Sequence, residues 1–283
     1  MIQPQTERYL ALVHHGRNQW WRYVAGVLII VLCGEGLAAL PYLWVAREGD
    51  PGGMPVFIAL NSGALITLGG LAITVLLVHR RSLLSLVTPH PRFDWRRAGQ
   101  GFAVWLALAA ASSVVESVLF PGSYRLTFNP DTFFVFAAVA LCLTPLQAAT
   151  EELLFRGYAM QGLGLLMTRP AVIAIVSSVI FMLPHLANPE VARHGLLVPP
   201  QYLVIGLLFA AVTLRDGRLE LAIGMHTANN IFSGLIANYE DSVLTTDALF
   251  TASYDPTYSL VSLIVASVAT YWVLFGRRDS NDL

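Results

Sequence analysis

The residues with the clearest chemical potential in this 283-residue chain are polar and ionisable side chains inside otherwise apolar stretches. A charge at membrane depth costs about 2.5–3.5 kcal/mol on insertion scales, so such residues usually mark a function. Three segments carry them, at Glu151, Glu152, Arg156, His185, His226 and Asn230. These are the residue types that activate water, donate hydrogen bonds to an oxyanion or bind a metal ion.

The first segment continues an apolar run and is predicted to be helical. Glu152 and Arg156 are four residues apart, the spacing at which opposite charges meet on a helix. Glu151 points about 100° away from its neighbour and is free to face a cavity as a general base. The competing interpretation is a structural ion-pair network that contains both glutamates and Arg156.

The second segment ends in His185, which shares a helix face with Phe181. A turn at 167–170 predicts an antiparallel hairpin of the first two segments. Glu151 and His185 are equally far along the chain from Thr168, so two straight helices would bring them to matching depth. Taken alone, His185 could simply form a hydrogen bond with a carbonyl group.

The third segment presents His226 and Asn230 on one helix face, because they are four residues apart. Hydrogen bonding between membrane helices is the alternative interpretation of such residues. Together, however, Glu, His, His and Asn supply what water-mediated amide hydrolysis needs: a base for water and donors to the oxyanion.

A zinc site is a second chemical possibility. Glu151, His185 and His226 could bind Zn²⁺ and leave one position for water. Their spacing is not that of the H-E-x-x-H signature, so a metal ion cannot be inferred from the sequence. The preferred interpretation requires no cofactor.

The elements that hold these residues are predicted to be membrane-spanning helices. The chain is 55% hydrophobic with a mean hydropathy of +0.61, and 12% of its residues are charged, against about 25% in soluble domains. We predict an all-α polytopic protein, a single integral-membrane domain over 1–283 with a polar catalytic cavity and a catalytic core at about 130–240. About eight spans are expected, at 23–46, 56–78, 99–120, 132–155, 170–187, 200–214, 219–238 and 257–275.

The basic residues predict the orientation, because loops rich in arginine stay cytoplasmic. All 17 basic residues are arginine, and most fall on one side of the predicted spans. Both termini are therefore expected in the cytoplasm, the 239–256 loop outside, and the chain in the cytoplasmic membrane. The first apolar run is expected to remain as a helix rather than be cleaved as a signal peptide. A net charge of −1 argues against a nucleic-acid partner and leaves the lipid bilayer as the expected surroundings.

Three motifs occur in order: E-E-x-x-x-R at 151–156, F-x-x-x-H at 181–185 and H-x-x-x-N at 226–230. Over about 130–240 the chain thereby resembles the type II CAAX prenyl endopeptidase and bacteriocin-processing family, also called CPBP or Abi. The resemblance implies an intramembrane protease that cleaves a membrane-anchored or lipid-attached polypeptide.

The same resemblance implies a role for each motif residue. Glu151 would activate water, and His226 with Asn230 would form the oxyanion hole. His185 would position the water or polarise Glu151. Glu152 and Arg156 would support the site structurally.

An ion-coupled transporter is the competing function, because buried Glu, His and Arg residues also build proton relays. A non-enzymatic membrane scaffold is a third possibility. Under the transporter hypothesis, Glu35 and Glu116, which also lie in predicted spans, should matter as much as Glu151. Under the protease hypothesis they should matter far less.

Overall fold

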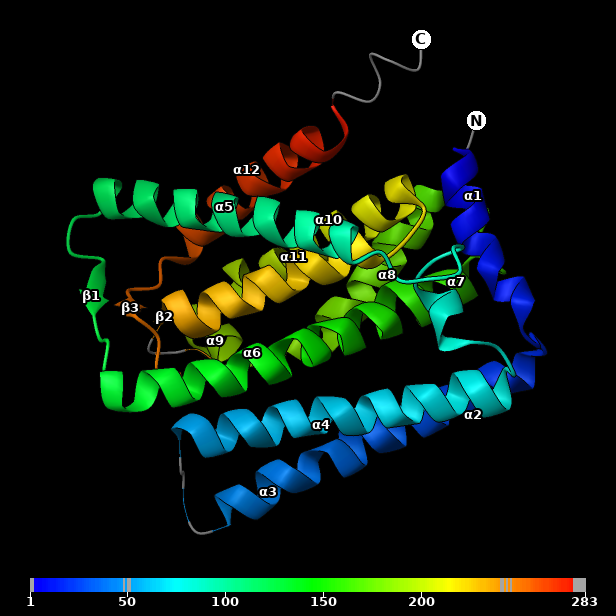
Figure 1. Cartoon of the computed structure of the whole chain (residues 1–283), viewed down its shortest axis with the longest axis horizontal. Helices are drawn as coiled ribbons and strands as arrows, with labels where there is room; N and C mark the ends of the chain where they lie inside the picture. The colour runs from blue at the N-terminus through cyan, green and yellow to red at the C-terminus, as the bar shows by residue number, and fades with distance from the viewer. Residues whose placement is uncertain are drawn as a thin grey trace.

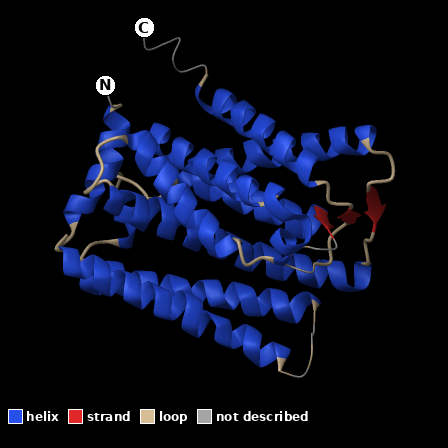
Figure 2. Cartoon of the chain, turned by 180° about the vertical axis from the view of Figure 1, so that it is seen from behind, coloured by secondary structure: helices blue, strands red, loops and turns tan. Residues whose placement is uncertain are grey.

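The computed structural model describes residues 3–47, 49, 52–239, 242, 244 and 246–276. They form a bundle of long helices with a small sheet at one end (Figures 1 and 2). The helices are α1 (Pro4–Leu10), η1 (Ala11–His15), α2 (Trp20–Val31), η2 (Leu32–Gly36), η3 (Leu37–Ala39), α3 (Leu40–Ala46), α4 (Gly53–Ile73), η4 (Thr74–Val78), η5 (Leu83–Leu86), α5 (Trp95–Leu119), α6 (Pro130–Glu152), η6 (Leu153–Ala159), α7 (Met160–Leu163), α8 (Pro170–His185), α9 (Pro189–His194), η7 (Gly195–Leu197), α10 (Pro199–Asp216), α11 (Glu220–Ile231), η8 (Phe232–Ile236) and α12 (Pro256–Phe275).

Three short strands, which the sequence did not predict, form the sheet: β1 (Tyr124–Leu126), β2 (Ala237–Tyr239) and β3 (Phe250–Ala252). The central strand β3 pairs antiparallel with β1 and parallel with β2. The sheet thus ties the α5–α6 connection to the chain that follows η8. Figure 2 shows it at the end of the bundle where these connections meet.

The predicted class, an all-α polytopic membrane protein, is confirmed, but the count of eight spans is not. Among the described residues, five stretches are long and apolar enough to cross a membrane, and a bent pair would make a sixth. The five are Trp20–Ala46, Gly53–Val78, Trp95–Leu119, Pro130–Leu163 and Pro256–Phe275, and the pair is Pro170–His185 with Pro189–Leu197, bent by 91°.

Two predicted spans, the sixth and seventh, are helices α10 and α11 with η8 but are not among these stretches. For α11, burial gives the physical reason why the helix need not be as apolar as a membrane span that faces lipid. Nearly all of its residues are buried, including Glu220 and His226. A helix surrounded by other helices needs no apolar surface for lipid, so it can carry polar groups.

The two ends of the bundle carry different elements, and ion pairs lie at one of them. Figure 1 shows α1, the α4–α5 connection and the α7–α8 connection at one end, and the sheet with α9 at the other. At the first end, Arg97 forms an ion pair with Asp216, and Arg218 pairs with Asp94 at 3.1 Å. The predicted orientation of the termini stays a prediction. Glu240 and Asp241 of the predicted external loop, and Arg277 and Arg278 near the C-terminus, lie outside the described residues.

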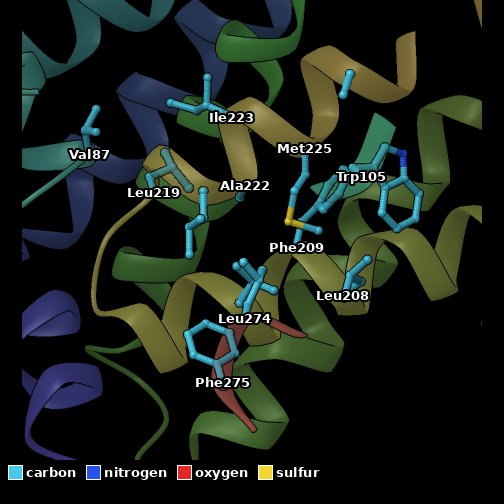
Figure 3. Packing of buried hydrophobic residues seen from close by; sticks show 13 residues of the cluster. Val87, Trp105, Leu208, Phe209, Leu219, Ala222, Ile223, Met225, Leu274 and Phe275 are labelled. Atoms are coloured by element: carbon cyan, nitrogen blue, oxygen red, sulfur yellow. The ribbon is translucent and has the colours of Figure 1, made fainter. Parts of the chain in front are cut away.

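Helix α11 is held in the centre by close packing against α5. A Cβ atom on Gly224 would lie 1.9 Å from the carbonyl oxygen of Ala98, and one on Gly101 would lie 2.3 Å from that of Leu221. Only glycine permits the two backbones to approach so closely. Figure 3 shows the apolar cluster around this crossing, in which Trp105 and Phe209 meet edge to face with centroids 6.3 Å apart. This packing fixes the position of His226 on α11.

Helix α6 continues beyond the predicted end of its span. It passes into the π-helical segment η6 directly after Glu152 and then into α7, so the stretch reaches Leu163. Gly157 lets the η5 segment approach, because a Cβ atom there would lie 2.9 Å from Leu86 Cβ. π-helical segments within α-helices often occur at functional sites.

Candidate active site

Glu151 lies opposite both predicted histidines. Its Oε2 atom is 3.7 Å from His226 Nε2 and 4.0 Å from His185 Nε2. The three residues come from α6, α11 and α8, so the three segments singled out by their sequence converge on one point. The hairpin of α6 and α8 places Glu151 and His185 at matching depth, as their equal distance from Thr168 predicted.

His185 is oriented by its own helix. Its Nδ1 atom lies 2.8 Å from the carbonyl oxygen of Phe181, which can only accept a hydrogen bond. The proton of this hydrogen bond therefore sits on Nδ1, and the Nε2 atom faces Glu151. The rings of Phe181 and Tyr202 flank the imidazole with centroid separations of 4.5 Å each.

Glu152 forms the predicted pair with Arg156 and also contacts His226, which sequence reasoning missed. Arg156 Nη1 and His226 Nδ1 approach the same Oε1 atom at 2.7 and 2.8 Å. The side chains of Glu152 and Arg156 are fully buried. Because Arg156 remains charged, Glu152 is a carboxylate and His226 Nδ1 donates to it. The Nε2 atom of His226 is left to face Glu151.

Arg156 is held between aromatic rings. Its guanidinium carbon lies 4.2 Å from the ring centroid of Phe181 and 5.4 Å from that of Phe209, and its Nη2 atom donates to Gly206 O at 3.3 Å. Cation–π contacts of this kind strengthen when water is excluded. The F-x-x-x-H motif therefore supplies the ring of Phe181, which packs against Arg156, as well as His185.

Asn230 reaches Glu151 through a residue that sequence reasoning did not select. Asn230 Nδ2 donates to Gln147 Oε1 at 2.8 Å, and Gln147 Nε2 donates to Glu151 Oε1 in a short contact. Trp105 Nε1 donates to Asn229 Oδ1 at 3.2 Å, and Asn229 donates to Asn230 Oδ1 at 3.0 Å. The position of Gln147 four residues before Glu151 was the signal that could have identified it.

A cavity of about 600 Å³ contains this cluster. It extends from Glu151, His185 and His226 to residues of β2 and β3, and thus toward the sheet end of the bundle (Figure 1). Glu116 on α5 also lines it, whereas Glu35 is exposed on the outside of the bundle and does not. The two carboxylates that the transporter hypothesis groups together therefore lie in different environments.

The three possible zinc ligands lie close together, and zinc binding stays a prediction. Within the described part of the chain, no three His, Cys, Asp or Glu side chains already have the geometry of a bound metal ion. The Nε2 atoms of both histidines face Glu151 Oε2, at 3.7 Å for His226 and 4.0 Å for His185.

The comparison with known families covers this site. Residues 130–232, which contain all three motifs, match the family model described as type II CAAX prenyl endopeptidase Rce1-like. This segment is therefore similar to the type II CAAX prenyl endopeptidases. The match runs from α6 to the start of η8 and includes each of the six residues selected from the sequence.

One curated relative extends the similarity beyond this segment. The chain is 31% identical over 180 residues to "Uncharacterized protein YyaK" of Bacillus subtilis (strain 168). The aligned region covers 63% of this chain and 60% of that protein. No solved structure matches the chain.

Proposed function

We propose that the chain is an intramembrane endopeptidase that hydrolyses a peptide bond of a membrane-anchored or lipid-attached polypeptide. The observation that carries the proposal is the environment of Glu151 Oε2. This buried atom has no hydrogen-bond partner among the described residues, and it faces the Nε2 atoms of His185 and His226. The match of residues 130–232 to the CAAX endopeptidase family model supports the same reaction class.

Glu151 and His185 are suited to bind and activate one water molecule between them. A gap of 4.0 Å separates Glu151 Oε2 from His185 Nε2, and a bridging water could donate one hydrogen bond to each atom. The water oxygen then keeps a lone pair for attack on the scissile carbonyl. As the carbon–oxygen bond forms, Glu151 takes the proton from water as general base.

His226 and Asn230 are the proposed donors to the oxyanion. One amide hydrogen of Asn230 is bound to Gln147 and the second remains for substrate. His226 donates from Nε2 only when both ring nitrogens carry protons, because Nδ1 already donates to Glu152. A charged His226 ring also balances the charges of the cluster. The carboxylates of Glu151 and Glu152 then face two cations, His226 and Arg156. Collapse of the oxyanion breaks the carbon–nitrogen bond, and Glu151 returns its proton to the leaving amine.

Metal removal is expected to leave the cleavage rate within about twofold of its starting value, since the protein's own groups supply the base and the oxyanion donors. The measurement is hydrolysis of a lipid-anchored peptide by protein in nanodiscs, before and after chelation. As a control, the zinc content of the same samples shows whether chelation removed the metal. Loss of activity on chelation that zinc alone restores would contradict the metal-free mechanism.

Asn230→Ala is expected to lower the cleavage rate by about 10²–10³-fold, the usual cost of removing one oxyanion donor. KM should change little, because the contact forms mainly in the transition state. Asn61→Ala serves as a matched control, since Asn61 also lines the cavity but bonds to Phe57 O within its own helix. Equal losses in both variants would remove Asn230 from the proposed oxyanion hole.

Access to the site is proposed from the end of the bundle that carries the sheet, because the cavity runs from Glu151 to that end. In the orientation that we propose from the arginine distribution, this end faces the external side of the cytoplasmic membrane. A suitable substrate therefore presents its cleavage site at or just below the outer surface, close to a membrane anchor.

A transporter remains the second candidate, because Glu116 lies in the same cavity as Glu151. Glu116 accepts a 2.5 Å hydrogen bond from the hydroxyl group of Tyr124. This hydrogen bond accounts for the position of Glu116 without a role in proton transport. The transporter hypothesis still predicts that substitutions at Glu116 and at Glu151 have equal effects.

A further inference from the structure

Glu190 on α9 is a buried carboxylate that the proposed reaction does not use. Glu190 is 3% exposed and lines the cavity. Oε1 accepts hydrogen bonds from the hydroxyl group of Tyr202 at 2.5 Å and from Asn188 Nδ2 at 3.4 Å. Oε2 is buried and has no hydrogen-bond partner among the described residues. A buried carboxylate is costly unless it is paired, so a cationic group is the natural complement of this atom.

Aromatic rings complete the surroundings of Glu190. Tyr239 and Tyr254 stack with centroids 4.7 Å apart, and both line the cavity with Tyr202. Burial, and next the nearby charge of Glu190, raise the pKa of Tyr239, so its ring stays neutral at physiological pH. A carboxylate beside neutral aromatic faces is the combination that binds ammonium and guanidinium groups.

The charge of the whole cavity agrees with this chemistry. Its described lining includes three carboxylates, those of Glu116, Glu151 and Glu190, and no arginine. Its two histidines, His185 and His226, lie in the catalytic cluster. A cavity whose lining carries an excess of negative charge raises the local concentration of cationic groups.

We propose that Glu190, Tyr202, Tyr239 and Tyr254 form a subsite that binds a cationic group of the substrate polypeptide. The group is a Lys or Arg side chain or a free amino terminus. The ring of Tyr202 connects this subsite to the catalytic cluster, because it packs against His185 with centroids 4.5 Å apart. The subsite therefore selects substrates that carry positive charge close to the scissile bond. This inference rests on the proposed endopeptidase function for its role but not for the binding itself.

Binding can be measured without turnover in full-length Glu151→Gln protein in nanodiscs. The probes are short, lipid-anchored peptides with an acetylated amino terminus, in which one lysine is moved along an alanine–leucine background. Matched peptides carry norleucine, which is similar in length and uncharged. We expect the best lysine position to bind about tenfold more tightly than norleucine, as one charge-assisted contact predicts. Peptides with a free amino terminus and no lysine test the alternative source of the charge.

Glu190→Gln, added to the same protein, is expected to remove this preference. Glutamine keeps an oxygen that accepts from Tyr202, so the fold should survive. Glu190→Asp, which keeps the charge, should retain part of the preference. Glu35→Gln is the matched control, because it removes an equal charge outside the cavity and should leave the preference unchanged.

Cleavage by protein with Glu151 intact gives the second measurement. The ratio of kcat/KM for lysine and norleucine peptides should fall about tenfold in Glu190→Gln. If the parent chain cleaves none of the peptides but the binding preference disappears in Glu190→Gln, the endopeptidase function fails and the subsite stands. A preference that persists in Glu190→Gln, or that no peptide shows, would overturn the subsite whether or not cleavage occurs.

Discussion

Glu151→Gln is expected to lower peptide-bond cleavage by about 10²–10⁴-fold, the usual contribution of a general base. Glutamine has the shape of glutamate but cannot accept the proton of the attacking water. Its amide oxygen can still accept the hydrogen bond from Gln147. The helical bundle should therefore remain folded. The measurement is the hydrolysis rate of a lipid-anchored peptide in nanodiscs, together with the thermal unfolding midpoint.

The neighbouring residue provides the control for this prediction. Glu152 holds both Arg156 and His226 in a fully buried position. Glu152→Gln should therefore lower the unfolding midpoint, whereas Glu151→Gln should not. Retention of substantial activity in well-folded Glu151→Gln would assign the base to another residue.

Arg156→Ala is expected to reduce the free energy of unfolding by about 3–5 kcal/mol, because it leaves Glu152 buried without its charged partner. The substitution also removes the contacts of the guanidinium group with the ring of Phe181 and with Gly206 O. Reversible unfolding in detergent, followed by circular dichroism, measures the change. Arg156→Lys should be intermediate, because lysine keeps the charge and lacks the planar group.

A double substitution separates the missing charge from the missing volume. Glu152→Gln with Arg156→Met removes both charges and keeps most of the volume, so it should recover part of the lost stability. If the double variant is less stable than Arg156→Ala, the uncompensated charge of Glu152 is not the cause of the loss. Activity is not the relevant measure here, because the double variant also changes the partner of His226.

Local spacing was sufficient to predict some features of the site. The four-residue separation of Glu152 and Arg156 predicted their ion pair, which depends only on helix geometry. The shared hairpin predicted that Glu151 and His185 face each other. The contact of His226 with Glu152 was not predictable in this way, because it depends on how α11 sits between α5 and α6.

The features missed in the sequence have identifiable physical causes. The polar residues of α11 are tolerated because other helices surround it, so apolarity alone is a poor guide to that segment. Glu190 follows Asn188 and Pro189, a combination typical of a turn, and gave no sign of burial. Gln147 carries no charge and stood out only once its contacts with Glu151 and Asn230 were known.

The most direct test of the central claim compares membranes from cells that express the parent chain or Glu151→Gln at equal levels, using proteomics of protein termini. The endopeptidase function predicts new termini in membrane-attached proteins only with the parent chain, close to their anchors and on the external side. If no terminus depends on Glu151 when candidate substrates are present, and Glu116→Gln reproduces the effects of Glu151→Gln on the cells, the result contradicts proteolysis and favours a transporter.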